Sequence, residues 1–321
     1  MNTRHKIIFD TDPGIDDAMA ILFAEAHPDI ELMGLTTVYG NAPIETTTKN
    51  ALFLKQKFGM DATIAKGADK PLVRSPLPPS SVVHAENGLG NYPVPENVEG
   101  EIDARPAWQY IVDTVRAHPG EITLVAVGPL TNLALALEAA PDIATLVEEV
   151  VIMGGAFGEN GHHGNVTPFA EANIHDDPHA ADKVLTAGWP VVIIGLDATH
   201  ECFFSRQYIE ELGREGGEMG KFIDDISKYY LDFYSARHGL DGCFVHDPSP
   251  VAYVIEPSLF TLRSGPVRVV TEGVAEGMTL QKTCERRYPY DDWKDIPEQD
   301  VAVNVREDEL LALYRNTFIT D

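Results

Sequence analysis

Short runs of β-forming residues alternate with helical patterns through the first two thirds of the chain, and this alternation limits the fold more than any other feature. A strand that is followed by a helix packing back on the sheet leads to parallel neighbouring strands. The predicted strands are 6–9 (KIIF), 31–38 (ELMGLTTV), 122–127 (ITLVAV), 148–153 (EEVVIM) and 190–196 (PVVIIGL). The predicted helices are 17–26, 44–58, 105–117, 131–140 and 178–187. We therefore predict an α/β fold with an open, mostly parallel, doubly wound (Rossmann-like) sheet flanked by helices.

The helix predicted over 178–187 has the clearest boundaries in the sequence. Asp177 is a preferred capping residue, and Pro178 suits the first helical position because the amide hydrogen that it lacks has no helical partner there. Gly188 follows the last predicted residue and is the residue type that most often ends a helix.

The rest of the chain predicts no second domain, and we expect one domain over 1–321. Residues 71–100 are irregular and rich in proline and glycine, which in a compact domain is more typical of a lid or binding loop than of a linker. After about residue 200 the pattern becomes helical over 206–236, and a small hairpin is predicted over 265–280.

Composition excludes several classes of partner. The chain has 321 residues and 44% hydrophobic residues, enough for a large core, but 24 Lys and Arg stand against 50 Asp and Glu. The formal net charge of -26 repels phosphate backbones and anionic lipids, so we expect neither nucleic acid nor membrane as a partner. Three distant cysteines indicate no disulfide framework. The sequence begins without a long apolar stretch, so a cytoplasmic location is expected.

Four aspartates, Asp10, Asp12, Asp16 and Asp17, fall within eight residues directly after the first predicted strand. Acidic residues stabilise a first helical turn by about 0.3–1 kcal/mol each, which accounts for one or two of them. Packed together with no Lys or Arg nearby in sequence, four carboxylates would raise one another's pKa. Because Ca²⁺ takes about six to eight oxygen ligands, a calcium ion would remove this conflict. The stretch therefore predicts a calcium site.

Two other acidic motifs were weighed against this interpretation. An EF-hand loop starting at Asp10 would need an acidic ligand at Ile21, and it would follow a helix instead of a strand, so this motif is excluded. An aspartate-based phosphatase with Asp10 as nucleophile and Asp12 as acid fits the D-x-D pattern. It would leave Asp16 and Asp17 without a role, and it stays an alternative.

Polar residues follow the carboxyl ends of all the predicted strands, where open α/β sheets bind their ligands. Further along, His246 and Asp247 precede a proline and an apolar helical pattern, and a polar segment carries Asn165, Glu171 and Asn173. Each of these is by itself compatible with a purely structural role. Together they predict one polar crevice.

The segments DTDPGIDDA, VYGN, GPLTN, VVIMGGAF, AEAN and VHDP occur in the order shown by the inosine-uridine preferring nucleoside hydrolase family. The chain resembles this family from Lys6 to about Val305. The resemblance implies hydrolysis of the N-glycosidic bond of purine or pyrimidine ribonucleosides to free base and ribose. It also implies one tightly bound calcium ion and a homodimer or homotetramer.

The same resemblance implies individual roles. Asp12, Asp17 and Asp247 would bind calcium through their side chains, and Val127 through its backbone carbonyl. Asp12 would also deprotonate a calcium-bound water, and His246 would protonate the departing base. His84, in the segment 71–100, would contact the base, and the sugar contacts would come from Asp16, Asn41, Met153, Asn165, Glu171 and Asn173.

These residue types suit the reaction independently of the family. Cleavage of a ribosyl C–N bond passes through an oxocarbenium-like state, so the site needs a positioned water, a base and an acid. A non-catalytic, calcium-loaded nucleoside-binding protein would keep the aspartates but would have no need of His246, and this alternative also stays open. The family often has threonine at Val127, where only the backbone is needed, and an aromatic residue at Ala172. The segments 71–100 and 235–244, which would cover the base, are irregular, so the sequence does not predict the preferred base.

Overall fold

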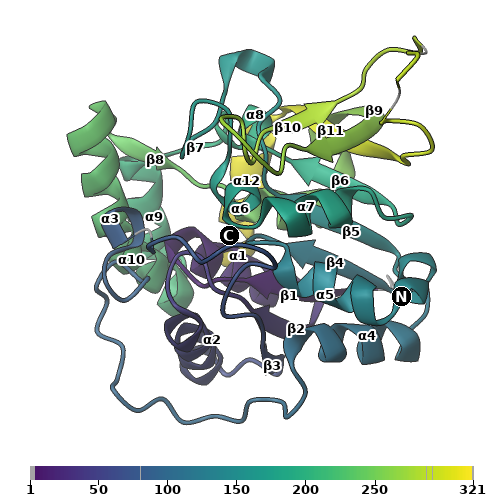
Figure 1. Ribbon diagram of the computed structural model, residues 1–321. Coiled ribbons are helices and arrows are strands. Elements are labelled where there is room, and N and C mark those ends of the chain that lie inside the picture. The colour runs from purple at the N-terminus through teal and green to yellow at the C-terminus, as the bar shows by residue number, and fades with distance from the viewer. Residues whose placement is uncertain (1–3, 80, 287, 291, 320–321) are drawn as a thin grey trace.

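A nine-stranded sheet runs through the computed structural model, which describes residues 4–79, 81–286, 288–290 and 292–319 (Figure 1). Its strands are β1 (His5–Thr11), β2 (Ile30–Thr37), β3 (Thr63–Lys66), β4 (Ile122–Ala126), β5 (Glu149–Met153), β6 (Val191–Ile194), β9 (Phe260–Val269), β10 (Thr279–Gln281) and β11 (Glu298–Val305). Their spatial order is β10-β9-β11-β6-β5-β4-β1-β2-β3. All neighbours from β3 to β11 are parallel, and β9 and β10 add an antiparallel edge. The predicted mostly parallel α/β sheet is confirmed.

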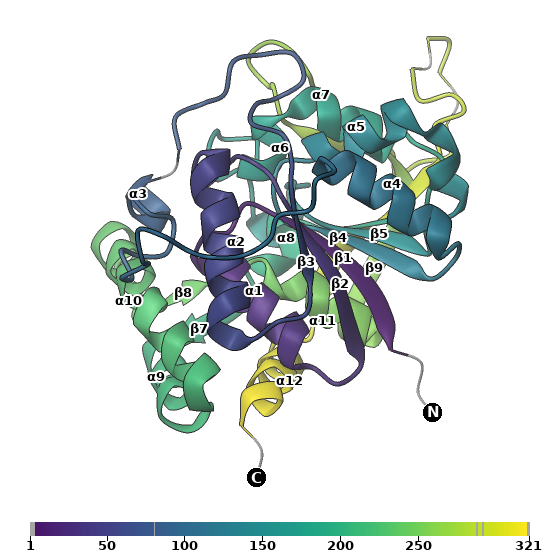
Figure 2. The ribbon, with the colours of Figure 1, turned by 90° about the horizontal axis from the view of Figure 1, so that it is seen from below.

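Helices cover both faces of the sheet, because the apolar side chains of each central strand alternate between two cores. In β1, Ile7 and Phe9 pack into one core and Ile8 into the other. The first core lies under α1 (Ile15–Ala26), α2 (Ile44–Phe58), α9 (Arg206–Glu215), α10 (Gly217–His238), α11 (Pro248–Ile255) and α12 (Glu307–Phe318). The second lies under α4 (Ala107–Ala117), α5 (Thr131–Ala139) and α7 (Pro178–Leu185), and Figure 2 shows the two layers from below.

The order of the strands places a switch point between β1 and β4. From β1 the chain builds outward through β2 to β3, and it then returns to the other side of β1 to form β4, β5 and β6. In such sheets the loops at the carboxyl ends of the two central strands separate and leave a crevice. The aspartates after β1 and Val127 after β4 both lie at this point.

Most predicted elements are present, with shifted boundaries. Helix α1 begins at Ile15, two residues before the predicted start, and the strand predicted over 190–196 is shortened to β6 by the start of the one-turn helix α8 (Leu196–Thr199). The hairpin predicted over 265–280 is confirmed as the antiparallel pair β9–β10. Among the strands of the nine-stranded sheet and the helices of the two cores, β3, β11 and α12 were not predicted.

The prediction for Gly188 is wrong. Helix α7 ends at Leu185, and Thr186 is its C-cap, with Oγ1 donating to the carbonyl of Asp182 at 2.6 Å. The helix stops earlier because the chain must turn into Trp189, whose indole N–H donates to the carbonyl of Val184 at 2.9 Å. The indole of Trp189 therefore pairs a carbonyl in the last turn of α7, where a glycine was expected to end the helix.

The segments outside the sheet also follow the sequence closely. The helical pattern over 206–236 forms two helices, α9 and α10, which are separated at Gly216. Helix α10 begins with Gly217, whose φ is 64°. Residues 71–100 contain only the short helix α3 (Ser81–His84), apart from residue 80, which is outside the described part of the chain. No helix in the described ranges is long and apolar enough to cross a membrane.

The predicted cap of α7 is confirmed and has a second task. One oxygen of Asp177 accepts the backbone N–H of Ala180 at 3.0 Å, and the other accepts from Thr131 Oγ1 at 2.8 Å and from the backbone N–H of Leu72 at 2.9 Å. This buried carboxylate therefore joins α7, the start of α5 and the start of the segment 71–100.

Replacement of Asp177 should destabilise the fold more than loss of an ordinary cap. Asp177→Ala leaves three donors unpaired, so we expect the free energy of unfolding to fall by about 2–4 kcal/mol. Ser205→Ala is the matched control, because Ser205 caps α9 with one bond to Tyr208 and should cost about 1 kcal/mol. Urea unfolding of both variants measures the difference, and equal losses would contradict the joining role of Asp177.

Candidate functional site

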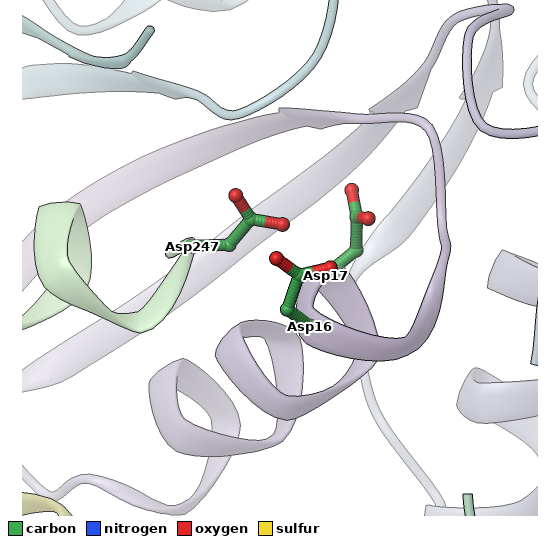
Figure 3. A group of neighbouring side chains, drawn as sticks. All are labelled: Asp16, Asp17 and Asp247. Atoms are coloured by element: carbon green, nitrogen blue, oxygen red, sulfur yellow. The ribbon is translucent and has the colours of Figure 1, made fainter. Parts of the chain in front are cut away.

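Three carboxylates from two helices meet at the switch point. Asp16 and Asp17 lie in the first turn of α1, and Asp247 directly precedes α11. Their carboxylate oxygens lie within 4.8 Å of one another, and Figure 3 shows the three side chains gathered between the two helix starts. All three residues are buried. Such a group of oxygen ligands could hold a metal cation.

Asp17 is held rigidly by its neighbours. One carboxylate oxygen accepts from Thr11 Oγ1 at 2.6 Å and from the backbone N–H of Asp12 at 3.2 Å. The other accepts from the backbone N–H of Gly14 and from Asn41 Nδ2, both at 2.9 Å. Asn41, predicted as a sugar contact, therefore uses its side-chain amide to position this carboxylate.

Asp12 lies outside the group of three, and its carboxylate is packed against backbone. One oxygen accepts the backbone N–H of Asn41 at 2.6 Å, while the other, Oδ1, is buried and has no hydrogen-bond partner among the described residues. A Cβ atom at Gly128 would lie 2.5 Å from this Oδ1, so the close approach requires glycine. A buried carboxylate oxygen without a partner is costly, and a cation would remove that cost.

Asp10 is a supporting residue. Its Oδ2 accepts from Thr36 Oγ1 at 2.6 Å and from Asn132 Nδ2 at 2.9 Å, while Oδ1 is buried and unpartnered. Burial raises the pKa of this carboxyl to about 7. Asp10 is not among the residues that line the cavity.

Burial also raises the pKa of the other aspartates. The pKa of Asp12 and that of Asp247 lie well above the ordinary value, first because of burial and then because of the neighbouring aspartates. The pKa of Asp16 is raised to about 6, and that of Asp17 is raised as well, in both cases mainly by burial. A divalent cation would supply the charge that lets these groups ionise together. The site thus fits a hard cation.

A cavity of about 650 Å³ opens above the carboxylates. Its floor is polar and comes from segments that follow strands, whereas its outer half is largely aromatic and comes from α10, α3 and the end of β8 (Gly242–Phe244). With the exception of Asp12 and Asp17, the predicted site residues line it, namely Asp16, Asn41, His84, Val127, Met153, Asn165, Glu171, Asn173, His246 and Asp247. A polar floor and an aromatic upper half suit a ligand with a hydroxylated part and a planar ring.

Glu171 and Asn173 shape the floor. Glu171 caps α6 (Ala172–Asp176) by accepting the backbone N–H groups of Asn173 at 2.9 Å and Ile174 at 3.1 Å, and it also accepts from Gly155 at 2.9 Å. Burial raises the pKa of Glu171 to about 7. Asn173 Nδ2 donates to the carbonyl of Val127 at 2.9 Å, so an amide group contacts the oxygen that was predicted as a metal ligand.

Two predicted sugar contacts lie on different sides of this floor. Met153 ends β5 and is buried, and its carbonyl accepts from Asn173 Nδ2 at 3.2 Å. Asn165 is exposed at the rim, where its Oδ1 accepts the backbone N–H of Ala172 at 3.0 Å. Ala172 itself lines the cavity, so the missing aromatic ring leaves this side of the rim open.

His84 joins the segment 71–100 to the acidic first turn of α1. Its Nδ1 accepts the backbone N–H of Ile15 at 3.2 Å, and its ring stacks on Tyr230 with centroids 5.9 Å apart. A Cβ atom at Gly14 would lie 2.7 Å from this Nδ1 and equally close to Asn41 Nδ2. Gly14 therefore lets the lid segment and the β2 loop approach the same turn.

His246 lies at the aromatic half of the cavity, beside Asp247. Its Nδ1 is 2.7 Å from Thr199 Oγ1, and its ring is tilted against that of His200 with centroids 5.2 Å apart. Burial lowers the pKa of His246 well below its ordinary value, and the neighbouring rings of His200 and His84 lower it further, because protonating adjacent imidazoles would place like charges together. The neutral form of the ring is therefore the stable one in this structure.

Sequence reasoning missed most of the aromatic half. Helix α10 contributes Tyr230, Phe233, Tyr234, Arg237 and His238 to the cavity, and only the last two fall in a segment that was expected to cover the base. Their spacing of three, four, seven and eight residues marks one face of a helix, which was a usable signal. That face could equally have been core, so only the tertiary structure distinguishes the two.

Comparisons with known proteins place the chain in one enzyme family. The sequence profile of the family described as inosine-uridine preferring nucleoside hydrolase matches residues 7–312. Uridine nucleosidase 1 of Arabidopsis thaliana is 40% identical over 289 residues, which cover 90% of this chain and 85% of that protein. The inosine-uridine preferring nucleoside hydrolase of Leishmania major is 40% identical over 287 residues, or 88% of either chain.

Solved structures give the same result. A plant nucleoside hydrolase superposes with a TM-score of 0.94 at 37% identity, covering 99% of both chains. A purine-preferring ribonucleoside hydrolase from Gardnerella vaginalis superposes with a TM-score of 0.89 at 32% identity, covering 98% of both chains. The chain thus belongs to the inosine-uridine preferring nucleoside hydrolase family and is an enzyme that acts on the N-glycosyl bond of ribonucleosides.

Proposed function

We propose that this chain is a calcium-dependent ribonucleoside hydrolase in which Asp12 is the general base and His246 assists the departing base. The observation that supports this most strongly is the buried group Asp16, Asp17 and Asp247, which lies beneath a cavity with an aromatic upper half. Ribose hydroxyls suit the acidic floor, and a planar base suits the aromatic rings.

The proposed ligands of the cation are Asp12, Asp17, Asp247 and the carbonyl of Val127. All are oxygen donors, the set that calcium prefers, and the unpartnered Oδ1 of Asp12 and the raised pKa values support this assignment. When bound, the cation would grip the ribose diol and acidify a water molecule. Asp16 is close enough to the other carboxylates to receive a ribose hydroxyl from the same diol.

Asp12 has the properties of a general base. Its Oδ2 is fixed by the backbone N–H of Asn41, which orients the carboxylate and leaves Oδ1 to accept a proton. Burial and the neighbouring Asp17 raise the pKa of Asp12, and a bound cation would lower it again, so that the carboxylate would be ionised and able to accept a proton. Asp12 would take that proton while the water attacks the anomeric carbon of the ribose.

His246 is proposed to act on the leaving base from the other side. Proton donation or a strong hydrogen bond to a departing nitrogen base contributes about 10²–10⁴-fold to the rate. His246 lines the cavity with its ring against His200, on the side of Asp247 where the aromatic rings begin. This arrangement supports a base and an acid on opposite sides of the scissile bond.

The base preference and the assembly also remain proposals. Among the similar proteins, one is named a uridine nucleosidase and another a purine-preferring hydrolase, so a panel of natural ribonucleosides is the direct test. Size-exclusion chromatography with light scattering tests the expected homodimer or homotetramer. Parallel assays with p-nitrophenyl phosphate test the phosphatase alternative, and release of free ribose distinguishes hydrolysis from binding alone.

The metal assignment predicts loss of activity on removal of either a ligand or the ion. Asp12→Ala and Asp17→Ala should each lower inosine hydrolysis by about 10³-fold or more, because each removes a carboxylate from the proposed site. Metal analysis should find about one calcium per wild-type chain and less in the variants. Asp142→Ala, at an exposed ion pair with Arg116, is the control that should change neither quantity. Full activity after rigorous chelation would contradict the calcium assignment.

The sugar contacts predict strong discrimination against 2′-deoxynucleosides. Removal of one hydroxyl leaves buried polar groups unpaired, so kcat/KM for 2′-deoxyinosine should be about 10³-fold or more below that for inosine. Asp16→Ala should reduce the difference in kcat/KM between inosine and 2′-deoxyinosine, because the proposed partner of the ribose hydroxyl is then already absent. Comparable rates on both nucleosides with the wild-type protein would show that the diol does not anchor the substrate.

The role of His246 predicts that its importance depends on the leaving group. His246→Ala should lower kcat on inosine by about 10²-fold or more, and much less on p-nitrophenyl riboside, whose phenolate departs without a proton. If His246 instead only supports Asp247, weaker metal binding should slow both substrates alike. Equal losses with reduced calcium content would therefore remove His246 from leaving-group chemistry.

A further inference from the structure

Thr199, a residue with no role in the predicted site, is the hydrogen-bond partner of His246. It is the last residue of α8, it is fully buried, and its Oγ1 lies 2.7 Å from His246 Nδ1 across 47 residues of sequence. Helix α8 is itself fixed, because Asp197 accepts the backbone N–H groups of Phe157 at 2.9 Å and Glu159 at 2.7 Å. The hydroxyl is therefore presented by a rigid element.

The other contacts of His246 fix its backbone. Its backbone N–H bonds to Asp16 and opposes the effect of burial on the pKa of that carboxyl, and its carbonyl accepts from the backbone N–H of Ser249 at 3.1 Å. Rotation of the ring is then governed by the bond at Nδ1. Because Nδ1 faces a fully buried residue, the opposite ring edge, which carries Nε2, is the one left for the cavity.

The hydrogen-bond needs of the Thr199 hydroxyl determine which ring nitrogen of His246 carries the proton. If Nδ1 were protonated, Thr199 would accept that proton, and its own hydroxyl hydrogen would need another acceptor. Within the described part of the chain the hydroxyl bonds only to this histidine. An unpaired buried donor costs about 1–3 kcal/mol, whereas donation from Oγ1 to an unprotonated Nδ1 satisfies both groups. The favoured neutral tautomer therefore carries its proton on Nε2.

We propose that Thr199 is a positioning residue that locks His246 in the Nε2–H tautomer and aims this N–H at the departing base. The proposal deepens the proposed function and rests on it, since it assumes that His246 assists the leaving group. With its Nδ1 occupied by Thr199, the ring presents Nε2–H to the cavity, where this group can donate a hydrogen bond to the departing base.

The tautomer can be observed directly by NMR. The calcium-loaded full chain, labelled with ¹⁵N-histidine, gives two-bond ¹H–¹⁵N correlations whose pattern distinguishes the two neutral forms, and His246→Gln identifies the relevant signals. Wild type and Thr199→Ser should show the Nε2–H form, because serine keeps the hydroxyl donor. Thr199→Val should lose that single form. An Nδ1–H form in the wild type would overturn the proposal.

Kinetics of the same variants test the consequence for catalysis. Thr199→Val should lower kcat on inosine by about tenfold or more, with KM changed by less than about threefold and p-nitrophenyl riboside hydrolysis nearly unchanged. Thr199→Ser should restore the inosine rate to within about threefold of wild type. Thr48→Val is the matched control, because it removes a buried hydroxyl that pairs with Thr37 away from the cavity. It should leave both rates unchanged.

The remaining outcomes separate this proposal from the proposed function. If wild-type protein hydrolyses inosine but Thr199→Val keeps the full rate, or slows both substrates equally with loss of calcium, the positioning role is wrong and the hydrolase stands. A failure of Thr199→Ser to restore the rate would overturn the role of the hydroxyl. If the wild-type protein releases no ribose from any ribonucleoside, the proposed function itself fails.

Discussion

The burial of several carboxylates at one strand end is the constraint on which this structure depends. Asp12, Asp16, Asp17 and Asp247 are almost fully excluded from water, and each raises the cost of ionising the others. The fold meets part of that cost with backbone N–H groups, hydroxyls and the amide of Asn41. The remaining electrostatic cost is one that a bound cation would offset, and this cost explains why the carboxylates gather at a single point.

Rigid attachment of these carboxylates explains why so many neighbouring residues are small or polar. Gly14, Gly40 and Gly128 each allow backbone, amide or imidazole groups to approach a carboxylate at distances that a Cβ atom would block. The turns that carry these glycines lie at the same edge of the sheet, because the parallel register of β1 with β2 and β4 aligns the carboxyl ends of the three strands. Precision at the site is thus a property of the sheet more than of the loops.

The sequence predicted the parts of this structure that local patterns determine. Apolar runs predicted β1, β2, β4, β5 and β6, and the aspartate cluster with the ordered motifs predicted the acidic floor and the family. Strand β11 and helix α12 were not predicted, because charged residues interrupt their apolar pattern. The helix end predicted from Gly188 was wrong, because α7 already ends at Leu185 and Thr186 is its C-cap. The aromatic face of α10 and the contact of Thr199 with His246 depend on packing between distant segments, which no local pattern encodes.

The two halves of the cavity are carried by different parts of the chain. The acidic floor is built from segments that follow strands, including the one with Asp247 after β8, whereas the upper half comes mainly from one face of α10, with α3 and Phe244 of β8. The two halves meet at Tyr230, whose ring stacks on His84, and His84 accepts the backbone N–H of Ile15 beside Asp16. On the proposed function, base preference and hydrolysis are therefore encoded largely in separate segments, and an engineer can vary the more exposed positions of α10, such as Phe233 and Arg237, while every floor residue keeps its identity.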